Sequence, residues 1–175
     1  EQLSEELVAL VPARVYVPVE LLPQLDLSPY LGKSEFFAVL PRIYRTQDEP
    51  ILRALLEDAA KKGVTGVSLA NLGHLSLVRG LDAALHGGWP LNLYNSAALA
   101  FWKEQGLSSA CVSFELRDAQ LRDLSKCLPC EAIVYGRLPL MVTENCLNAN
   151  ESGCRYFTER PASVPCDGAC ASAPE

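Results

Sequence analysis

Residues 64–88 read VTGVSLANLGHLSLVRGLDAALHGG, and they decide the fold class. The run at 64–70 is short, apolar and bounded by turn residues, which predicts a strand. Apolar side chains then recur at helical spacing over 75–85, and the pair Gly87-Gly88 is expected to end that helix. A short strand followed by a helix and a glycine turn is the repeating unit of a mostly parallel sheet.

The same alternation continues on both sides of this stretch. Further strands are predicted at 14–19, 36–43, 90–94, 110–114 and 132–135, and further helices at 48–62, 97–105 and 118–124. A complete eight-unit barrel needs about 200 residues or more. The chain has 175 residues. We therefore expect an α/β fold: a partial or incomplete (β/α) barrel of about six mostly parallel strands, with a Cys-rich C-terminal tail.

Composition limits the classes of protein to consider. The chain is 49% hydrophobic and carries a net charge of −6, which argues against a free-standing nucleic-acid-binding protein. No apolar run is long enough to cross a bilayer, so we expect no membrane contact. The only methionine is Met141, so we expect a fragment of a longer protein, with a barrel-type domain at 1–143 and a Cys-rich loop segment at 144–175.

Polar residues directly follow the predicted strands. In folds of this class the chemistry lies at the carboxyl ends of the strands. Three of these residues, Asn95, Glu115 and Arg137, are our candidate catalytic residues for acid–base work on an anionic substrate. The alternative is that they are ordinary polar loop residues. The complete set is Glu20, Arg42, Asn71, Asn95, Glu115 and Arg137.

Three other polar residues are expected to be less informative. Asn92 falls inside the predicted strand at 90–94, where its amide either points into the polar mouth or is satisfied in the core. His74 opens a predicted helix and His86 closes one, so both are expected to be exposed caps.

Four of the seven cysteines lie in the tail, at Cys146, Cys154, Cys166 and Cys170. This segment has few core-forming residues, so we expect a bound metal or a covalent cross-link to order it. Four thiolates would suit a zinc ion or an iron–sulfur cluster. Two disulfides or free thiols are the alternatives. The odd cysteine count favours a reducing, cytoplasmic location.

The remaining cysteines are expected to be structural. Cys111 sits within a predicted strand, as a small apolar core residue. Cys127 and Cys130 form a CxxC pair in a predicted loop, whereas redox pairs of this spacing begin a helix. Metal binding by this pair is a lesser alternative.

Four runs carry a family resemblance: GVTGVSLANLGHL (63–75), PLNLYNSAAL (90–99), SFELRDAQL (113–121) and EAIVYGRLPLMVTENC (131–146). They resemble peptidase family U32, the collagenase-like proteases, and most of all the C-terminal U32-like module of the long bacterial members. Glu131, Ile133, Gly136 and Leu138 fit the family signature, and Cys146 falls at its second cysteine. The resemblance implies a barrel-like domain and the peptidase label.

The sequence departs from that signature at three positions. Arg137 replaces a small residue, Pro139 replaces the first signature cysteine, and Glu144 replaces a glycine. The resemblance implies a [4Fe-4S] cluster in members that act as oxygen-independent hydroxylases, held by both signature cysteines and two later ones. Only Cys146 carries over, so Cys154, Cys166 and Cys170 would have to complete the site.

Two functions remain open at this point. In the first, the chain is a domain of an enzyme that acts on a macromolecule, RNA or protein, with hydroxylase-like or peptidase-like chemistry and a four-cysteine metal site. In the second, it is a non-catalytic module that packs against other domains of its parent chain, with structural zinc or free thiols.

Overall fold

The computed structural model describes residues 10–139, and within them six strands form one sheet. Every neighbouring pair is parallel, and the spatial order of the strands is their order in the chain. A parallel sheet wound in sequence order is the arrangement of a (β/α) barrel. The strands are β1 Arg14–Pro18, β2 Glu35–Val39, β3 Gly66–Leu69, β4 Ala84–Gly87, β5 Ser109–Cys111 and β6 Cys130–Glu131.

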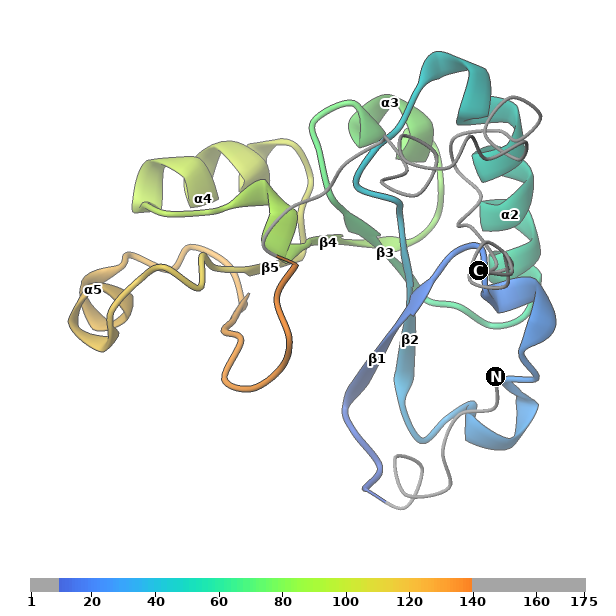
Figure 1. Cartoon of the computed structure of the whole chain (residues 1–175), viewed down its shortest axis with the longest axis horizontal. Coiled ribbons are helices and arrows are strands. Elements are labelled where there is room, and N and C mark those ends of the chain that lie inside the picture. Colours follow the sequence, from blue (N-terminus) through green and yellow to red (C-terminus); the bar gives the residue numbers. More distant parts are fainter. Residues whose placement is uncertain (1–9, 140–175) are drawn as a thin grey trace, which may run out of the picture. The chain divides into compact units, whose positions relative to one another are not determined.

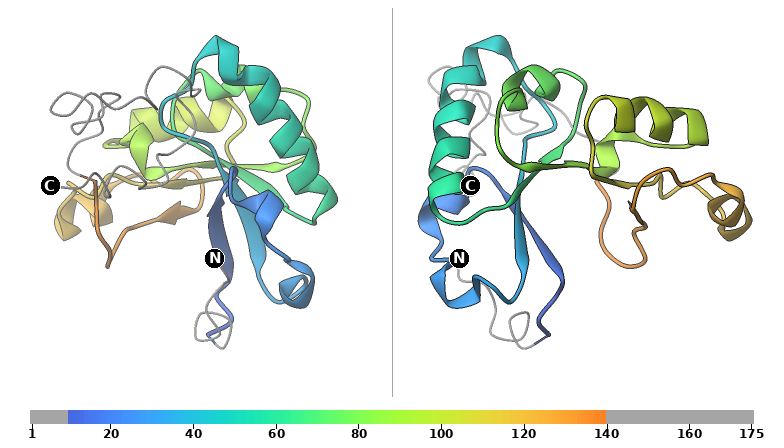
Figure 2. Two further views of the ribbon diagram at one scale, coloured as in Figure 1. Left: turned by 45° about the vertical axis from the view of Figure 1, so that its right-hand side comes forward. Right: turned by 180° about the vertical axis from the view of Figure 1, so that it is seen from behind.

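Helices follow most of the strands. Figures 1 and 2 show the strands turning progressively from β1 to β5, so the sheet curls into a half-barrel. The predicted partial α/β barrel is therefore confirmed. The α-helices are α2 Glu49–Lys61, α3 His74–Val78, α4 Ser96–Glu104 and α5 Asp118–Asp123, and the 3-10 helices are η1 Leu22–Gln24, η2 Ser28–Tyr30, η3 Thr46–Asp48 and η4 Trp89–Leu91.

The core lies between the sheet and its helices. Alternate strand residues such as Phe36, Ala38 and Val67 are buried, and they belong to one cluster with Leu52 and Leu56 of α2. The other residues of each strand therefore face the inside of the curl. The sheet belongs to a compact unit at Glu1–Val134, and Tyr135–Glu175 forms a second unit. The predicted boundary at 143/144 lies outside the described residues.

The prediction for the fourth strand was wrong. Helix α3 ends at Val78, and the following strand is β4 at Ala84–Gly87 rather than residues 90–94. Gly80 adopts a left-handed backbone with φ of 85°, which breaks the expected helix. An apolar run of this length fits a helix or a strand. The parallel pairing with β3 makes residues 84–87 a strand.

Residues 90–94 have a different role from the one predicted. Trp89–Leu91 forms η4, and Asn92 caps it with a φ of 49°, so Asn92 is not in a strand. Leu93 keeps a single bridge to Val112.

The sixth strand was also misplaced. β6 spans Cys130–Glu131, two residues before the predicted start at 132. Val134 and Tyr135 are 94% and 98% exposed, so the apolar run at 132–135 is not part of the core. In the part of the chain that the structure describes, no helix is long and apolar enough to cross a membrane.

Gly66 makes room for an aromatic ring inside the curl. A Cβ at this position would lie 2.2 Å from a ring carbon of Phe37, its register partner on β2. That distance is shorter than any van der Waals contact. The ring therefore occupies the space that a side chain on β3 would need.

We predict that Gly66→Ala lowers the free energy of unfolding by about 1–3 kcal/mol, because the added methyl group overlaps the Phe37 ring. Urea unfolding measures the change. In a Phe37→Leu background the same substitution should cost clearly less, because the smaller side chain leaves room. An equal cost in both backgrounds would contradict the contact.

Candidate functional site

A cavity of about 470 Å³ opens at the carboxyl ends of the strands. Its walls are mostly apolar and include Leu69, Trp89 and Ile133. Its position is the one at which barrel folds carry their binding sites. The ionisable residues that line it are Tyr16, Glu20, Arg42, His86, Cys111 and Glu131.

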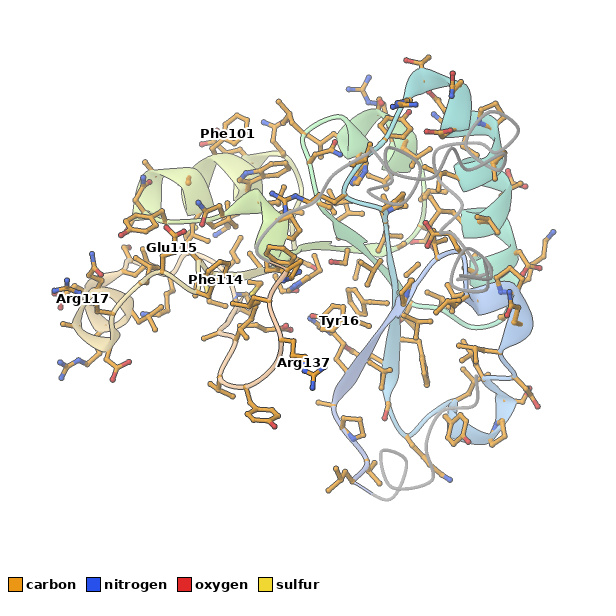
Figure 3. The ribbon with its side chains drawn as sticks, viewed as in Figure 1. Tyr16, Phe101, Phe114, Glu115, Arg117 and Arg137 are labelled. Atoms are coloured by element: carbon orange, nitrogen blue, oxygen red, sulfur yellow. The ribbon has the colours of Figure 1, made fainter. Side chains whose placement is uncertain are left out.

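The floor of the cavity is built around Glu131 on β6. The Tyr16 hydroxyl on β1 lies 2.7 and 2.8 Å from the two carboxylate oxygens of Glu131, and its single hydrogen is shared between them. Arg14 Nη1 donates to Glu131 Oε1 at 3.0 Å. Figure 3 shows Tyr16 extending from β1 toward the orange segment that contains β6. The first and last strands are thus joined by side chains rather than by backbone hydrogen bonds.

Arg14 has further partners besides Glu131. Its guanidinium donates to Glu35 Oε2 on β2 at 3.0 Å and to Ser109 Oγ on β5 at 3.0 Å. It also lies over the Phe37 ring, with Cζ 4.1 Å from the ring centroid. One arginine thus links four of the six strands. Burial and its bond to Arg14 act on Tyr16 in opposite directions, and burial wins, so the pKa of Tyr16 is raised.

His86 on β4 lies beside this cluster and is 2% exposed. Its Nδ1 is 2.8 Å from Ser109 Oγ, and its Nε2 is 3.8 Å from Glu131 Oε2. Burial lowers the pKa of His86 to about 4, although the Glu131 charge opposes that shift. The imidazole is therefore neutral at neutral pH.

The distance of 2.8 Å between Ser109 Oγ and His86 Nδ1 would suit a serine nucleophile and its general base, but the surroundings of Ser109 do not. Ser109 is 4% exposed and its Oγ accepts from Arg14, and it is not among the residues lining the cavity. A serine nucleophile must be open to its substrate. This pair is therefore a structural link between β4 and β5.

The prediction that both histidines are exposed caps was wrong. His74 is fully buried at the start of α3, and its Nδ1 accepts a hydrogen bond from the Ala70 N–H at 3.0 Å. Burial lowers the pKa of His74 to about 4, and a hydrogen bond to the Pro41 backbone offsets this only in part. His74 thus ties α3 to the ends of β2 and β3, just behind the cavity.

Two of the predicted strand-end residues lie at the cavity. Glu20 is half-buried there, and burial raises its pKa. Arg42 is exposed, with Cζ 5.5 Å from the centroid of the Trp89 ring. Asn71 donates to the Arg42 carbonyl at 3.1 Å, so it holds the loop after β2.

Two of the three candidate catalytic residues, Asn95 and Glu115, are not among the residues that line this cavity. Asn95 caps α4 by accepting from the Ala98 N–H at 2.9 Å. Glu115 is exposed, does not line the cavity, and lies well away from Tyr16 in Figure 3. Arg137 is exposed and belongs to the second compact unit. The structure therefore does not gather Asn95 and Glu115 in this cavity.

The candidate metal ligands Cys146, Cys154, Cys166 and Cys170 lie outside the described residues. Within residues 10–139, no group of three or more His, Cys, Asp or Glu side chains has the arrangement of a metal site. Cys111 is buried in β5 as predicted, and burial raises its pKa to about 11. Cys127 and Cys130 are free and partly buried. Cys130 Sγ donates to the Leu128 carbonyl at 3.3 Å.

A comparison with family models matches residues 31–173 to peptidase family U32. The chain belongs to peptidase family U32. No match was found among curated proteins or solved structures. Glu131, which the sequence matches to the family signature, is the carboxylate that Arg14 and Tyr16 of β1 contact.

Sequence reasoning missed the β1 side of the site. In RVYVP at 14–18, the polar residues Arg14 and Tyr16 alternate with Val15 and Val17. In an ordinary barrel strand both faces are apolar. Polar side chains on the inner face of a strand therefore indicate that another polar group in the interior needs hydrogen-bond partners. That signal was available in the sequence of this U32 domain.

We predict that both histidines of the U32 domain stay neutral well below the usual titration range. Their folded pKa values of about 4 lie below the ordinary 6.5, so the unfolded chain binds more protons between these values. Stability is then complete near neutral pH and is lost as the pH falls through 6.5 toward 4. The loss is about 2 kcal/mol per histidine by about pH 5.

Long-range ¹H–¹⁵N NMR of the imidazoles measures this directly, since the chain has two histidines. The urea-denatured chain is the control and should titrate near the ordinary value. An imidazole that titrates near 6.5 in the folded protein would contradict the burial of that histidine.

Proposed function

We propose that this U32 domain binds one group of a macromolecular substrate in the cavity at the strand ends. In the C-terminal tail, Cys146, Cys154, Cys166 and Cys170 hold a zinc ion or a [4Fe-4S] cluster. The observation that carries the proposal is the cavity itself. About 470 Å³ of mostly apolar space ends on a floor of fixed polar groups. Ligand sites of soluble proteins have this size and this division of apolar walls and few polar groups.

The floor can act on protons as well as bind. Among the described residues, Glu131 Oε2 accepts from Tyr16 alone and keeps a second lone pair free, whereas Oε1 accepts from both Tyr16 and Arg14. Tyr16 is a proton donor rather than a base, because burial raises its pKa. A carboxylate acceptor beside a phenolic donor is suited to general acid–base steps. Glu131 is the residue of this chain we assign to that role.

The tail fits a metal by the chemistry of its donors. Four cysteine thiolates are the usual ligands of a structural zinc ion and of a [4Fe-4S] cluster. A bound cluster would supply one-electron chemistry, whereas zinc would staple the tail. The parent protein would then act on RNA or protein, with this domain contacting its other domains.

The residue at position 139 favours a second function, that of a non-catalytic module. Pro139 stands where the family signature has its first cysteine. This change removes one expected thiolate from the ancestral site. The alternative is a non-catalytic module that orients the catalytic half of its parent, with structural zinc or free thiols.

We predict that the whole chain, purified without oxygen, is brown and contains about four iron atoms per chain. Colourless protein with one zinc ion supports the second function. Cys154→Ser should lose the metal, and the matched control Cys127→Ser should keep it. Metal-free wild-type protein contradicts both metal sites, and metal retained by Cys154→Ser transfers the site to other cysteines.

The cavity is tested by an NMR titration with toluene, a small ring compound. The chain has two tryptophans, and Trp89 lines the cavity while Trp102 is buried in the core. The indole N–H signal of Trp89 should shift with increasing ligand, and that of Trp102 should stay as the internal control. If neither toluene nor its hydroxylated analogue shifts Trp89, the cavity is not a ligand site.

A further inference from the structure

We propose that the cavity floor recognises a neutral hydroxyl group carried on a ring of the ligand. The hydroxyl oxygen accepts a hydrogen bond from His86 Nε2–H and donates one to Glu131 Oε2. This inference rests on the proposed function, because it takes the cavity as the ligand site. It adds the chemical class of the group that the site selects.

The hydrogen-bond pattern fixes which imidazole nitrogen carries the proton. Arg14 has only donors, so Ser109 Oγ accepts from Arg14 Nη1 at 3.0 Å. The hydroxyl hydrogen of Ser109 then needs an acceptor, and His86 Nδ1 lies 2.8 Å away. Nδ1 therefore accepts, and the proton of the neutral imidazole is on Nε2.

His86 Nε2 is a donor without a partner among the described residues. The side chain is 2% exposed, yet Glu131 Oε2 at 3.8 Å is too far for a hydrogen bond. Every sealed side-chain nitrogen or oxygen in residues 10–139 has a partner. His86 lines the cavity, so the cavity is the side from which a ligand can reach Nε2.

The spacing of the two atoms selects the ligand group. A single oxygen atom can lie about 2.8 Å from both Nε2 and Oε2, which is the ordinary length of such hydrogen bonds. A hydroxyl combines an acceptor and a donor on one atom. An ether lacks the donor, an ammonium group lacks the acceptor for Nε2–H, and a carboxylate would face Glu131 with like charge.

Charge also favours a neutral group. Glu131 is already paired with Arg14 at 3.0 Å, so the floor does not need a cation. Above the floor the walls are apolar, with Leu69, Ile133 and the Trp89 ring. These walls fit a ring better than a flexible polar chain, because a ring fills apolar space at low conformational cost.

The test compares three ring compounds on the whole chain by NMR, with the Trp89 indole N–H and the His86 imidazole as reporters. The probes are 4-methylphenol, 4-methylanisole, which accepts but cannot donate, and toluene. We expect 4-methylphenol to bind roughly ten-fold or more tightly than either analogue, because the other two leave a polar group of the floor unpaired. Its addition should shift the His86 Nε2–H signal and leave His74 unchanged.

A variant separates the hydroxyl contact from occupancy of the cavity. His86→Phe should reduce the preference for 4-methylphenol over toluene, because the ring remains and the donor is removed while Glu131 Oε2 still accepts from the hydroxyl. If this variant does not fold, the comparison of the three probes on the wild-type chain decides the proposal by itself.

Equal affinity of the wild-type chain for toluene and 4-methylphenol overturns the hydroxyl inference and leaves the cavity as a ligand site. Equal affinity for 4-methylanisole and 4-methylphenol overturns the role of Glu131 as acceptor, and with it the proposal. No shift of Trp89 with any probe overturns the proposed function as well.

Discussion

The contact of Arg14 and Tyr16 on β1 with Glu131 on β6 is the constraint on which the rest of the domain depends. Within residues 10–139, backbone hydrogen bonds join only neighbouring strands, so β1 and β6 are the two edges of the described sheet. A complete barrel closes these edges with backbone bonds. Here three side chains span the interior instead, at distances of 2.7 to 3.0 Å. They hold the curvature of a sheet that would otherwise be open.

This bridge also creates the cavity. A barrel core is normally filled by layers of branched apolar side chains. In this domain the interior at the level of Arg14 holds charged and aromatic groups. Arg14 is stacked on Phe37 and hydrogen-bonded to Ser109. The space above them stays open at the strand ends. The same residues that close the sheet therefore provide the polar floor on which a ligand can be recognised.

The sequence was enough for the architecture because the βα repeat is a local signal, read from strand-length apolar runs and glycine stops. It was not enough for β4, since residues 84–87 fit a helix or a strand equally well and only pairing with β3 decides between them. His86 was misjudged for the same reason, because an expected helix end became a buried strand. The family signature singled out Glu131, but its partners on β1 are more than 110 residues away in the chain. Such long-range pairs cannot be found from spacing.

The central claim is that Arg14 and Glu131 stabilise the domain as a pair across the interior. A double-mutant cycle with Arg14→Gln, Glu131→Gln and the combined variant, followed by urea unfolding at low salt, measures their interaction free energy. The account predicts a coupling of at least about 0.5 kcal/mol, the lower part of the range for contacting residues, because both side chains are partly exposed. Additive effects, with a coupling below about 0.3 kcal/mol, would show that the two strands are not held together by this pair.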